Sequence, residues 1–173
     1  MIAEMQNFLY FAYGSNMLHT RLLERTPSAL SLGTGFITGW RLTFNKYGRD
    51  GTGKCDIEPA SEDGRVYGVL YEISSLEKPI LDDFEKGYES LAVTVRETEG
   101  GNRQALAYVA CDKKENLSPF HWYKKLVIAG AVQNRFPSSY IDQIRAVLSI
   151  EDTDISRRQK NEALIPENIT ALL

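Results

Sequence analysis

Residues 10–17 read Tyr10-Phe11-Ala12-Tyr13-Gly14-Ser15-Asn16-Met17 and join an apolar run to a polar turn. The aromatic and apolar residues of 8–13 predict a buried strand, and Gly14 to Asn16 have the composition of a turn. A short helix is expected over 17–25, with Pro27 beyond its end. The residues that recur at helical spacing in this segment are Met17, Leu18, Arg21, Leu22 and Arg25.

The turn in this segment has features of a ligand-binding loop. Gly14 permits backbone conformations and close approaches that other residues cannot make. The N–H groups of such a turn, with a helix start behind them, form a site for an anion or a carbonyl oxygen. From spacing alone, the simpler interpretation is an ordinary strand-turn-helix connection with Asn16 as the helix N-cap.

Strand-like segments dominate the first two-thirds of the chain and helical segments the last third. The run Glu99-Gly100-Gly101-Asn102 between two of the strands is typical of a hairpin. This order predicts an α+β fold with a mixed, largely antiparallel sheet or small barrel, flanking helices and a helical C-terminal third. The further strands are expected at 36–47 (one or two), 54–60, 66–73, 91–98 and 103–111, and the further helices at 74–84, 118–131, 137–148 and 154–164.

Three helix starts carry specific end signals. Ser74-Ser75-Leu76-Glu77 has the pattern of a capping box, with Pro79 tolerable only in the first turn of the helix. Ser118-Pro119 suits an N-cap followed by the first helical position. Pro137 opens a helix whose apolar stripe is expected to contain Tyr140, Ile141, Ile144, Val147 and Leu148.

Length and charge exclude several classes of protein. The chain has 173 residues, with 20 Lys plus Arg against 23 Asp plus Glu, so its formal net charge is −3. This length predicts one globular domain over 1–173, with 149–173 as a helical C-terminal extension. The mild acidity gives no electrostatic footprint for nucleic acid, and it offers no broad basic field to attract an anionic peptide. Substrate capture is therefore expected to rest on local groups, the N–H donors of the turn above all.

The sequence also argues against a membrane or secreted protein. No apolar run approaches the ~18 residues of a membrane span. The N-terminus contains Glu4 and no basic segment, which is untypical of a signal peptide. Cys55 and Cys111 are too few for a disulfide framework and too isolated for a Cys-rich metal site. A cytoplasmic protein with reduced thiols is expected, with one buried disulfide as the alternative.

Several segments together resemble the gamma-glutamylcyclotransferase-like superfamily. The run 10–17 is similar to its signature loop, and Gly68-Val69-Leu70-Tyr71 is similar to the strand before its catalytic helix. Leu81-Asp82-Asp83-Phe84-Glu85 resembles its Leu-Asp-x-x-Glu segment. Tyr123-Lys124-Lys125 and Phe136-Pro137-Ser138-Ser139-Tyr140 resemble its C-terminal helical part, so that the likeness extends over about 8–148.

The resemblance implies an enzyme that cyclises a gamma-glutamyl amino acid or gamma-glutamyl amine to 5-oxoproline and releases the free amine. It implies Glu85 as the catalytic acid/base, a role for which burial would raise the pKa of the carboxyl usefully. It also implies that the backbone of Gly14, Ser15 and Asn16 holds the glutamyl group and its oxyanion. Tyr13, Tyr88 and Tyr123 are further candidates for substrate binding, as pocket walls or hydrogen-bond donors.

The implied reaction needs no cofactor, metal or protein nucleophile, and its partner is a small-molecule substrate. A monomer or homodimer is expected, with neither nucleic acid nor membrane as a partner. Two departures from the family pattern concern the same region: Lys86 separates Glu85 from Gly87, and Leu91 stands where a Tyr is common, with Tyr88 as its substitute. Glu89 is therefore the alternative candidate for the acid/base.

Other readings of the sequence are weaker. Ser15 with His19 or His121 as a base would suggest a serine hydrolase, but the pattern Gly-x-Ser-x-Gly is absent. The His, Cys and acidic residues show no metal-ligand spacing. The basic and aromatic run 121–125 is better explained as part of a helix with a solvated and a core face. The serious alternative to the enzyme is a non-catalytic ligand-binding or interaction protein on the same scaffold.

Overall fold

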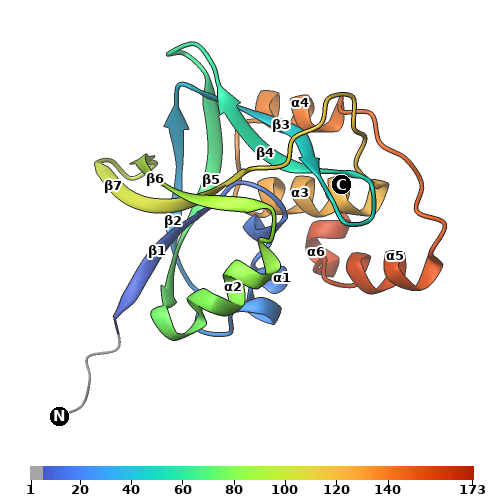
Figure 1. The fold of residues 1–173 in the computed structure, drawn as a ribbon, viewed down its shortest axis with the longest axis horizontal. Helices are drawn as coiled ribbons and strands as arrows, with labels where there is room; N and C mark the ends of the chain where they lie inside the picture. Colours follow the sequence, from blue (N-terminus) through green and yellow to red (C-terminus); the bar gives the residue numbers. More distant parts are fainter. Residues whose placement is uncertain (1–5) are drawn as a thin grey trace.

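The fold is built on a closed barrel of five strands, seen in a computed structural model that describes residues 6–173 (Figure 1). The strand order is β1-β5-β2-β6-β7, and neighbouring strands are antiparallel except β1 and β7, which pair in parallel through Tyr10 and Leu106. The strands are β1 (Asn7–Ala12), β2 (Leu30–Thr38), β5 (Arg65–Ser74), β6 (Tyr88–Glu97) and β7 (Asn102–Ala110).

A second, two-stranded sheet extends from the barrel. It consists of β3 (Trp40–Tyr47) and β4 (Gly53–Pro59), which pair antiparallel. Their register shifts between Thr43 and Lys46, so one extra residue bulges on β3. Beyond this bulge, the end of the hairpin contributes Lys46, Arg49, Asp50 and Lys54 to the candidate site described below.

Helices cover one side of the barrel, where Figure 1 shows α3 to α6 together. Helix α3 is the central one, because eight of its thirteen residues are buried and it packs against the short helix η1 and against α4, α5 and α6. The predicted α+β class with a small, mixed barrel and a helical C-terminal third is confirmed. The helices are η1 (Ser15–Met17), α1 (His19–Arg25), η2 (Ser75–Glu77), α2 (Lys78–Phe84), α3 (His121–Gln133), α4 (Ser138–Arg145), α5 (Ile155–Glu162) and α6 (Glu167–Thr170).

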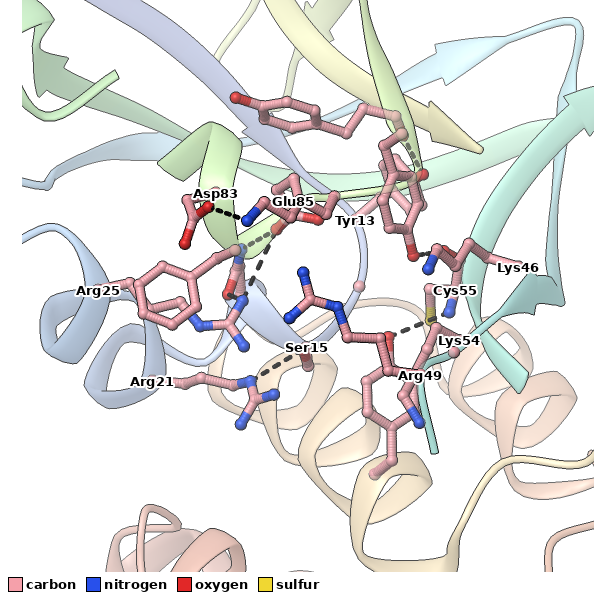
Figure 2. Close-up of a pocket in the computed structure, with 18 of the residues that line it drawn as sticks. Tyr13, Ser15, Arg21, Arg25, Lys46, Arg49, Lys54, Cys55, Asp83 and Glu85 are labelled. Carbon is pink, nitrogen blue, oxygen red and sulfur yellow. Dashed lines mark hydrogen bonds and ion pairs between the residues drawn. The ribbon is translucent and has the colours of Figure 1, made fainter. Parts of the chain in front are cut away.

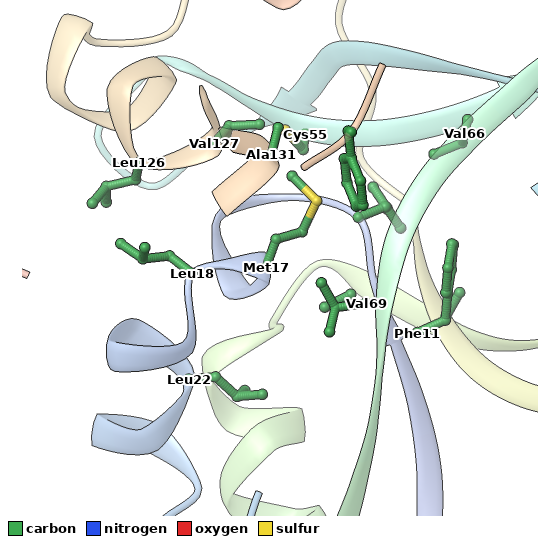
Figure 3. Close-up of a cluster of buried hydrophobic side chains, with 14 of the residues drawn as sticks. Phe11, Met17, Leu18, Leu22, Cys55, Val66, Val69, Leu126, Val127 and Ala131 are labelled. Carbon is green, nitrogen blue, oxygen red and sulfur yellow. The ribbon is translucent and has the colours of Figure 1, made fainter. Parts of the chain in front are cut away.

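The core joins the barrel to α3 through the segment that follows β1. Phe11, Met17 and Leu18 are fully buried, and Figure 3 shows Met17 and Leu18 turned toward Val127 and Leu126 of α3. A β-carbon on Gly130 would lie only 2.7 Å from Cβ of Met17. Glycine at this position therefore lets α3 approach η1 closely, which holds the turn after β1 in place.

Four of the expected helices differ from the structure in their bounds or in their caps. The helix expected over 17–25 is two pieces, because Leu18 has an extended backbone between η1 and α1. Only half of the expected capping box forms. The hydroxyl of Ser74 accepts from the backbone N–H of Leu76, but the carboxylate of Glu77 accepts from the backbone N–H and the hydroxyl of Ser28. A partner distant in sequence has thus displaced the local one.

The helix expected from Ser118-Pro119 begins only at His121, after Phe120. The carbonyl of Ser118 instead accepts from the N–H of Gly53, so this residue stays tied to the β3-β4 hairpin. The apolar stripe of α4 is shorter than expected, because Leu148 lies beyond the helix and is 82% exposed. Helix α6 was not predicted.

The C-terminal residues 149–173 form α5 and α6, and both pack on α3. That the whole chain forms a single domain stays a prediction.

Cys55 is buried and Cys111 is exposed, and both are free thiols. Glu4 lies outside the described residues. Over 6–173, none of the helices combines the length and the apolar character needed to cross a membrane.

Candidate active site

A pocket of about 410 Å³ opens where the turn after β1, the β3-β4 hairpin, the end of α2 and the start of α3 meet (Figure 2). All seven residues singled out from the sequence line it: Tyr13, Gly14, Ser15, Asn16, Glu85, Tyr88 and Tyr123. Glu89, the alternative acid/base, is exposed on β6 and does not line this pocket.

Glu85 is the C-cap of α2, and its backbone N–H donates to the carbonyl of Leu81. Its side chain is 13% exposed and faces Asn16, whose Nδ2 donates to Oε1 at 2.9 Å. Arg25 lies 3.7 Å from the same oxygen. Burial raises the pKa of Glu85 above its ordinary value, although Arg25 and the Asn16 hydrogen bond oppose that rise. Oε2 has no hydrogen-bond partner among the described residues, so it is the oxygen free to exchange a proton.

The side chain of Asn16 organises this carboxylate. Its Nδ2 donates to Tyr10 at 3.1 Å as well as to Glu85, and its Oδ1 accepts from Arg25 at 3.1 Å. Asn16 is therefore not the helix N-cap that spacing alone suggested, because Gly14 occupies the N-cap position of η1 without a side-chain cap. With its amide engaged, Asn16 can offer a ligand only its backbone.

The turn at residues 14–16 forms part of the pocket wall. Gly14 packs against β4, since a β-carbon there would lie 3.0 Å from Cβ of Cys55. The first N–H groups of a helix have no partner within it, and no side chain among the described residues accepts from those of Gly14, Ser15 or Asn16. Ser15 is not a nucleophile here, because its hydroxyl accepts from Nε of Arg21 at 3.0 Å rather than contacting a base.

The three tyrosines differ in what their hydroxyls can do. Tyr13 donates to the carbonyl of Tyr108, and Tyr88 donates to the carbonyl of Cys55 at 2.7 Å. Both therefore act as pocket walls rather than as donors to a ligand. Tyr123 accepts from the N–H of Cys55 at 3.0 Å, which leaves its own proton available in the pocket. Burial raises the pKa of all three phenols well above 10, so they stay neutral.

The pocket is rich in positive charge, which the sequence patterns did not predict. Two of the basic residues had a signal in the sequence, because Arg21 and Arg25 recur at helical spacing with the buried Leu22. The others come from elements far apart in the chain, which no local pattern indicates. Three acidic side chains, Asp50, Asp83 and Glu85, accompany seven basic ones: Arg21, Arg25, Lys46, Arg49, Lys54, Lys86 and Arg157.

The weaker sequence hypotheses find no support in this geometry. His121 bonds Ser149 at 2.7 Å, outside the pocket, and His19 stacks on Tyr71. Within residues 6–173 no group of three or more His, Cys, Asp or Glu side chains is placed to hold a metal ion. Trp122 and Tyr123 of the run 121–125 are buried in the core, in agreement with the helix interpretation.

Known proteins are similar to this chain both in sequence and in fold. The profile of the AIG2-like family matches residues 65–144. A gamma-glutamylcyclotransferase of Bos taurus is 30% identical over 168 residues, which cover 91% of this chain and 86% of the relative. The chain belongs to the gamma-glutamylcyclotransferase family. The resemblance found in the sequence is thereby confirmed.

Two further members of the gamma-glutamylcyclotransferase family extend the likeness to nearly the whole chain. The Homo sapiens gamma-glutamylcyclotransferase is 28% identical over 179 residues, or 92% of this chain and 93% of the relative. A solved gamma-glutamyl cyclotransferase superposes with a TM-score of 0.79 at 26% identity, over 96% of this chain and 98% of that one. This protein is thus a gamma-glutamylcyclotransferase-like enzyme.

Proposed function

We propose that this enzyme converts a gamma-glutamyl amino acid or gamma-glutamyl amine into 5-oxoproline and the free amine, with Glu85 as the acid/base. The observation that carries the proposal is the position of Glu85, a nearly buried carboxylate that accepts a hydrogen bond from Asn16 in the turn at residues 14–16. An intramolecular acyl transfer needs one proton acceptor beside the reacting atoms and donors for the oxyanion. The pocket offers both on adjacent walls.

In the proposed reaction, the α-amino nitrogen of the glutamyl group attacks its own γ-carbonyl carbon. Oε2 of Glu85 takes a proton from that nitrogen as the new C–N bond forms. The same oxygen returns the proton to the leaving nitrogen as the original amide C–N bond breaks. A raised pKa suits this double role, because a carboxyl that is a weaker acid is a better base in the first step.

The backbone N–H groups of Gly14, Ser15 and Asn16 are proposed to stabilise the oxyanion that develops on the γ-carbonyl. Their suitability rests on the place of these residues in the pocket wall, on the absence of a side-chain acceptor for them among the described residues, and on the packing of the turn against α3 and Cys55. Preorganised donors of this kind contribute roughly 3 kcal/mol each to the transition state. Tyr123 adds one further donor at the same pocket.

A panel of gamma-glutamyl amino acids, gamma-glutamyl amines and glutathione, assayed for 5-oxoproline, tests this function. We expect release from at least one member, and a loss of about 10²- to 10⁴-fold in kcat for Glu85→Gln. Glu89→Gln is the matched control, because it removes the exposed carboxylate four residues away, and it should keep full activity. Full activity of Glu85→Gln would disprove the mechanism, and release from no member would favour a non-catalytic binding protein.

A further inference from the structure

Lys46 is a buried cation that forms no ion pair with any of the residues that the structure describes. The residue is only 7% exposed, and its Nζ donates to the carbonyl of Tyr47 at 2.8 Å. It forms no ion pair within residues 6–173, whereas the neighbouring Lys54 is paired with Asp50 at 2.8 Å. A buried charge is costly unless it is paired, so an unneutralised ammonium in a pocket wall favours binding of an anion.

The sheet brings this cation into the pocket by an irregularity. Lys46 lies opposite Lys54 in the β3-β4 register, directly after the bulge on β3. Like charges placed opposite each other on two strands are destabilising, and bulges often redirect a side chain beside an active site. Both lysines line the pocket, where Figure 2 shows them on the side of Cys55, across from Arg25. The arrangement therefore places two lysines on one wall of the pocket, of which Lys54 is paired with Asp50.

This wall adjoins the acid/base rather than the glutamyl loop alone. A β-carbon on Gly87, two residues after Glu85, would lie 3.1 Å from Nζ of Lys46. The same nitrogen lies 5.3 Å from the centre of the Tyr88 ring. Lys46 is thus held over the segment that directly follows Glu85, and both side chains line the same pocket.

We propose that Lys46 is the residue that selects the leaving group, by binding the α-carboxylate of a departing amino acid. This inference rests on the proposed function. The leaving nitrogen must reach Glu85 to be protonated, and in an α-amino acid the carboxylate carbon is only two bonds from that nitrogen. A cation that lines the same pocket, over Gly87 and Tyr88, is placed to meet the carboxylate of an amino acid, while a simple amine presents no charge to it.

Two substrates that differ only in this carboxylate test the inference, gamma-glutamylalanine and gamma-glutamylethylamine. The wild-type chain should prefer gamma-glutamylalanine in kcat/KM. Lys46→Met should lower kcat/KM for gamma-glutamylalanine by about 10- to 100-fold, the effect of losing a hydrogen bond to a charged group. It should leave kcat/KM for gamma-glutamylethylamine within about threefold, since no such bond exists there. Lys46→Arg should recover part of the preference.

Lys114→Met is the matched control, because Lys114 also stacks on a tyrosine ring, that of Tyr47 at 5.2 Å, but lies outside the pocket. Lys114→Met should leave kcat/KM unchanged for both substrates. Equal wild-type kcat/KM for the two substrates, or an equal loss of both in Lys46→Met, would overturn the role of Lys46 and leave the proposed function intact. If neither of these substrates yields 5-oxoproline while another member of the panel does, the role of Lys46 fails and the proposed function stands; release from no member of the panel overturns both. Should Lys46→Met not fold, Lys46→Gln takes its place with the same expected outcomes.

Discussion

Nδ2 of Asn16 donates to Oε1 of Glu85 at 2.9 Å, although the two residues are 69 positions apart in the chain. One residue belongs to the turn after β1 and the other ends α2. Their contact joins the proposed oxyanion loop and the proposed acid/base into one unit, and it leaves Oε2 of Glu85 without a hydrogen-bond partner among the described residues. Motion of either element would therefore disturb both parts of the proposed chemistry.

Replacing Asn16 should impair catalysis through Glu85. In Asn16→Ala we expect kcat/KM to fall about 100-fold, the scale of a small misplacement of a catalytic group. Loss of a hydrogen bond that favours the carboxylate should also raise the pKa of Glu85, which moves the acidic limb of the pH–rate profile to higher pH. Tyr10→Phe removes only the Tyr10 contact of Asn16 and should cause a smaller loss. An unchanged acidic limb in Asn16→Ala would contradict this positioning role.

Arg25 should set the pH at which activity disappears. Its charge lowers the pKa of Glu85 against the stronger effect of burial. Removal of that charge in Arg25→Gln should raise the pKa further, so activity that requires the ionised base is lost at a higher pH as the solution is acidified. Profiles of kcat/KM against pH for the wild type, Arg25→Gln and Arg25→Lys measure this shift. Arg25→Lys keeps the charge and should shift less; a shift of Arg25→Gln to lower pH would refute the assignment.

Glu85 should cost stability at neutral pH. Its folded pKa is raised above the ordinary 4.5, so its contribution to stability is greatest below pH 4.5 and is lost as pH rises through the folded pKa. Gln at this position carries no charge to desolvate. We therefore expect the Tm of Glu85→Gln to exceed that of the wild type at pH 7 and to approach it near pH 4. Thermal unfolding followed across this range is the measurement, and a lower Tm at pH 7 would be inconsistent with it.

Gly14 should tolerate no side chain. In Gly14→Ala the new β-carbon would lie 3.0 Å from Cβ of Cys55, whose backbone Tyr88 and Tyr123 hold from both sides. Overpacking of this kind costs about 1–3 kcal/mol, and a displaced turn should reduce kcat/KM more than about tenfold. The double variant Gly14→Ala/Cys55→Gly removes the opposing atom and should recover part of the activity. No recovery would place the cause elsewhere than in this contact.

The C-terminal segment should be secured by the ion pair between Asp152 and Arg157. The carboxylate of Asp152 is fully buried, accepts from Arg157 at 2.6 Å and from Trp122 at 2.7 Å, and these bonds lower the pKa of Asp152. Asp152→Asn should cost about 2 kcal/mol, less than the roughly 3–5 kcal/mol of a fully buried pair, because Arg157 is 39% exposed.

The pH dependence of the same pair has the opposite sign from that of Glu85. A depressed folded pKa contributes stability above the ordinary carboxyl value of 3.8, and the contribution is lost as pH falls below it. The difference in Tm between the wild type and Asp152→Asn should therefore be large at pH 7 and should shrink as pH drops through 3.8. A difference that stays constant with pH would show that packing, rather than charge, holds this segment.

Much of the fold was visible in local sequence patterns. The strands at 8–13 and 66–73 and the hairpin at Gly100-Gly101 follow from residue types that act within a few positions. Both glycines of that hairpin have φ near +100°, which L side chains rarely adopt. The family resemblance likewise predicted that Glu85 and the turn at residues 14–16 belong to one site. The expected cytoplasmic location and monomeric or homodimeric state stay predictions.

Other features depend on contacts that no window of sequence contains. Closure of the barrel by Tyr10 and Leu106, the capture of Glu77 by Ser28 and the register shift before Lys46 each require that distant elements have already packed. The net charge of −3 even suggested that capture would rest mainly on backbone donors, whereas folding gathers seven basic side chains around the pocket. Backbone propensities and turn residues act locally, so the sequence alone determined most of the elements, and its family resemblance indicated the two proposed parts of the candidate site. The electrostatic character of the pocket was decided only by tertiary structure, because charge adds up over space and not along the chain.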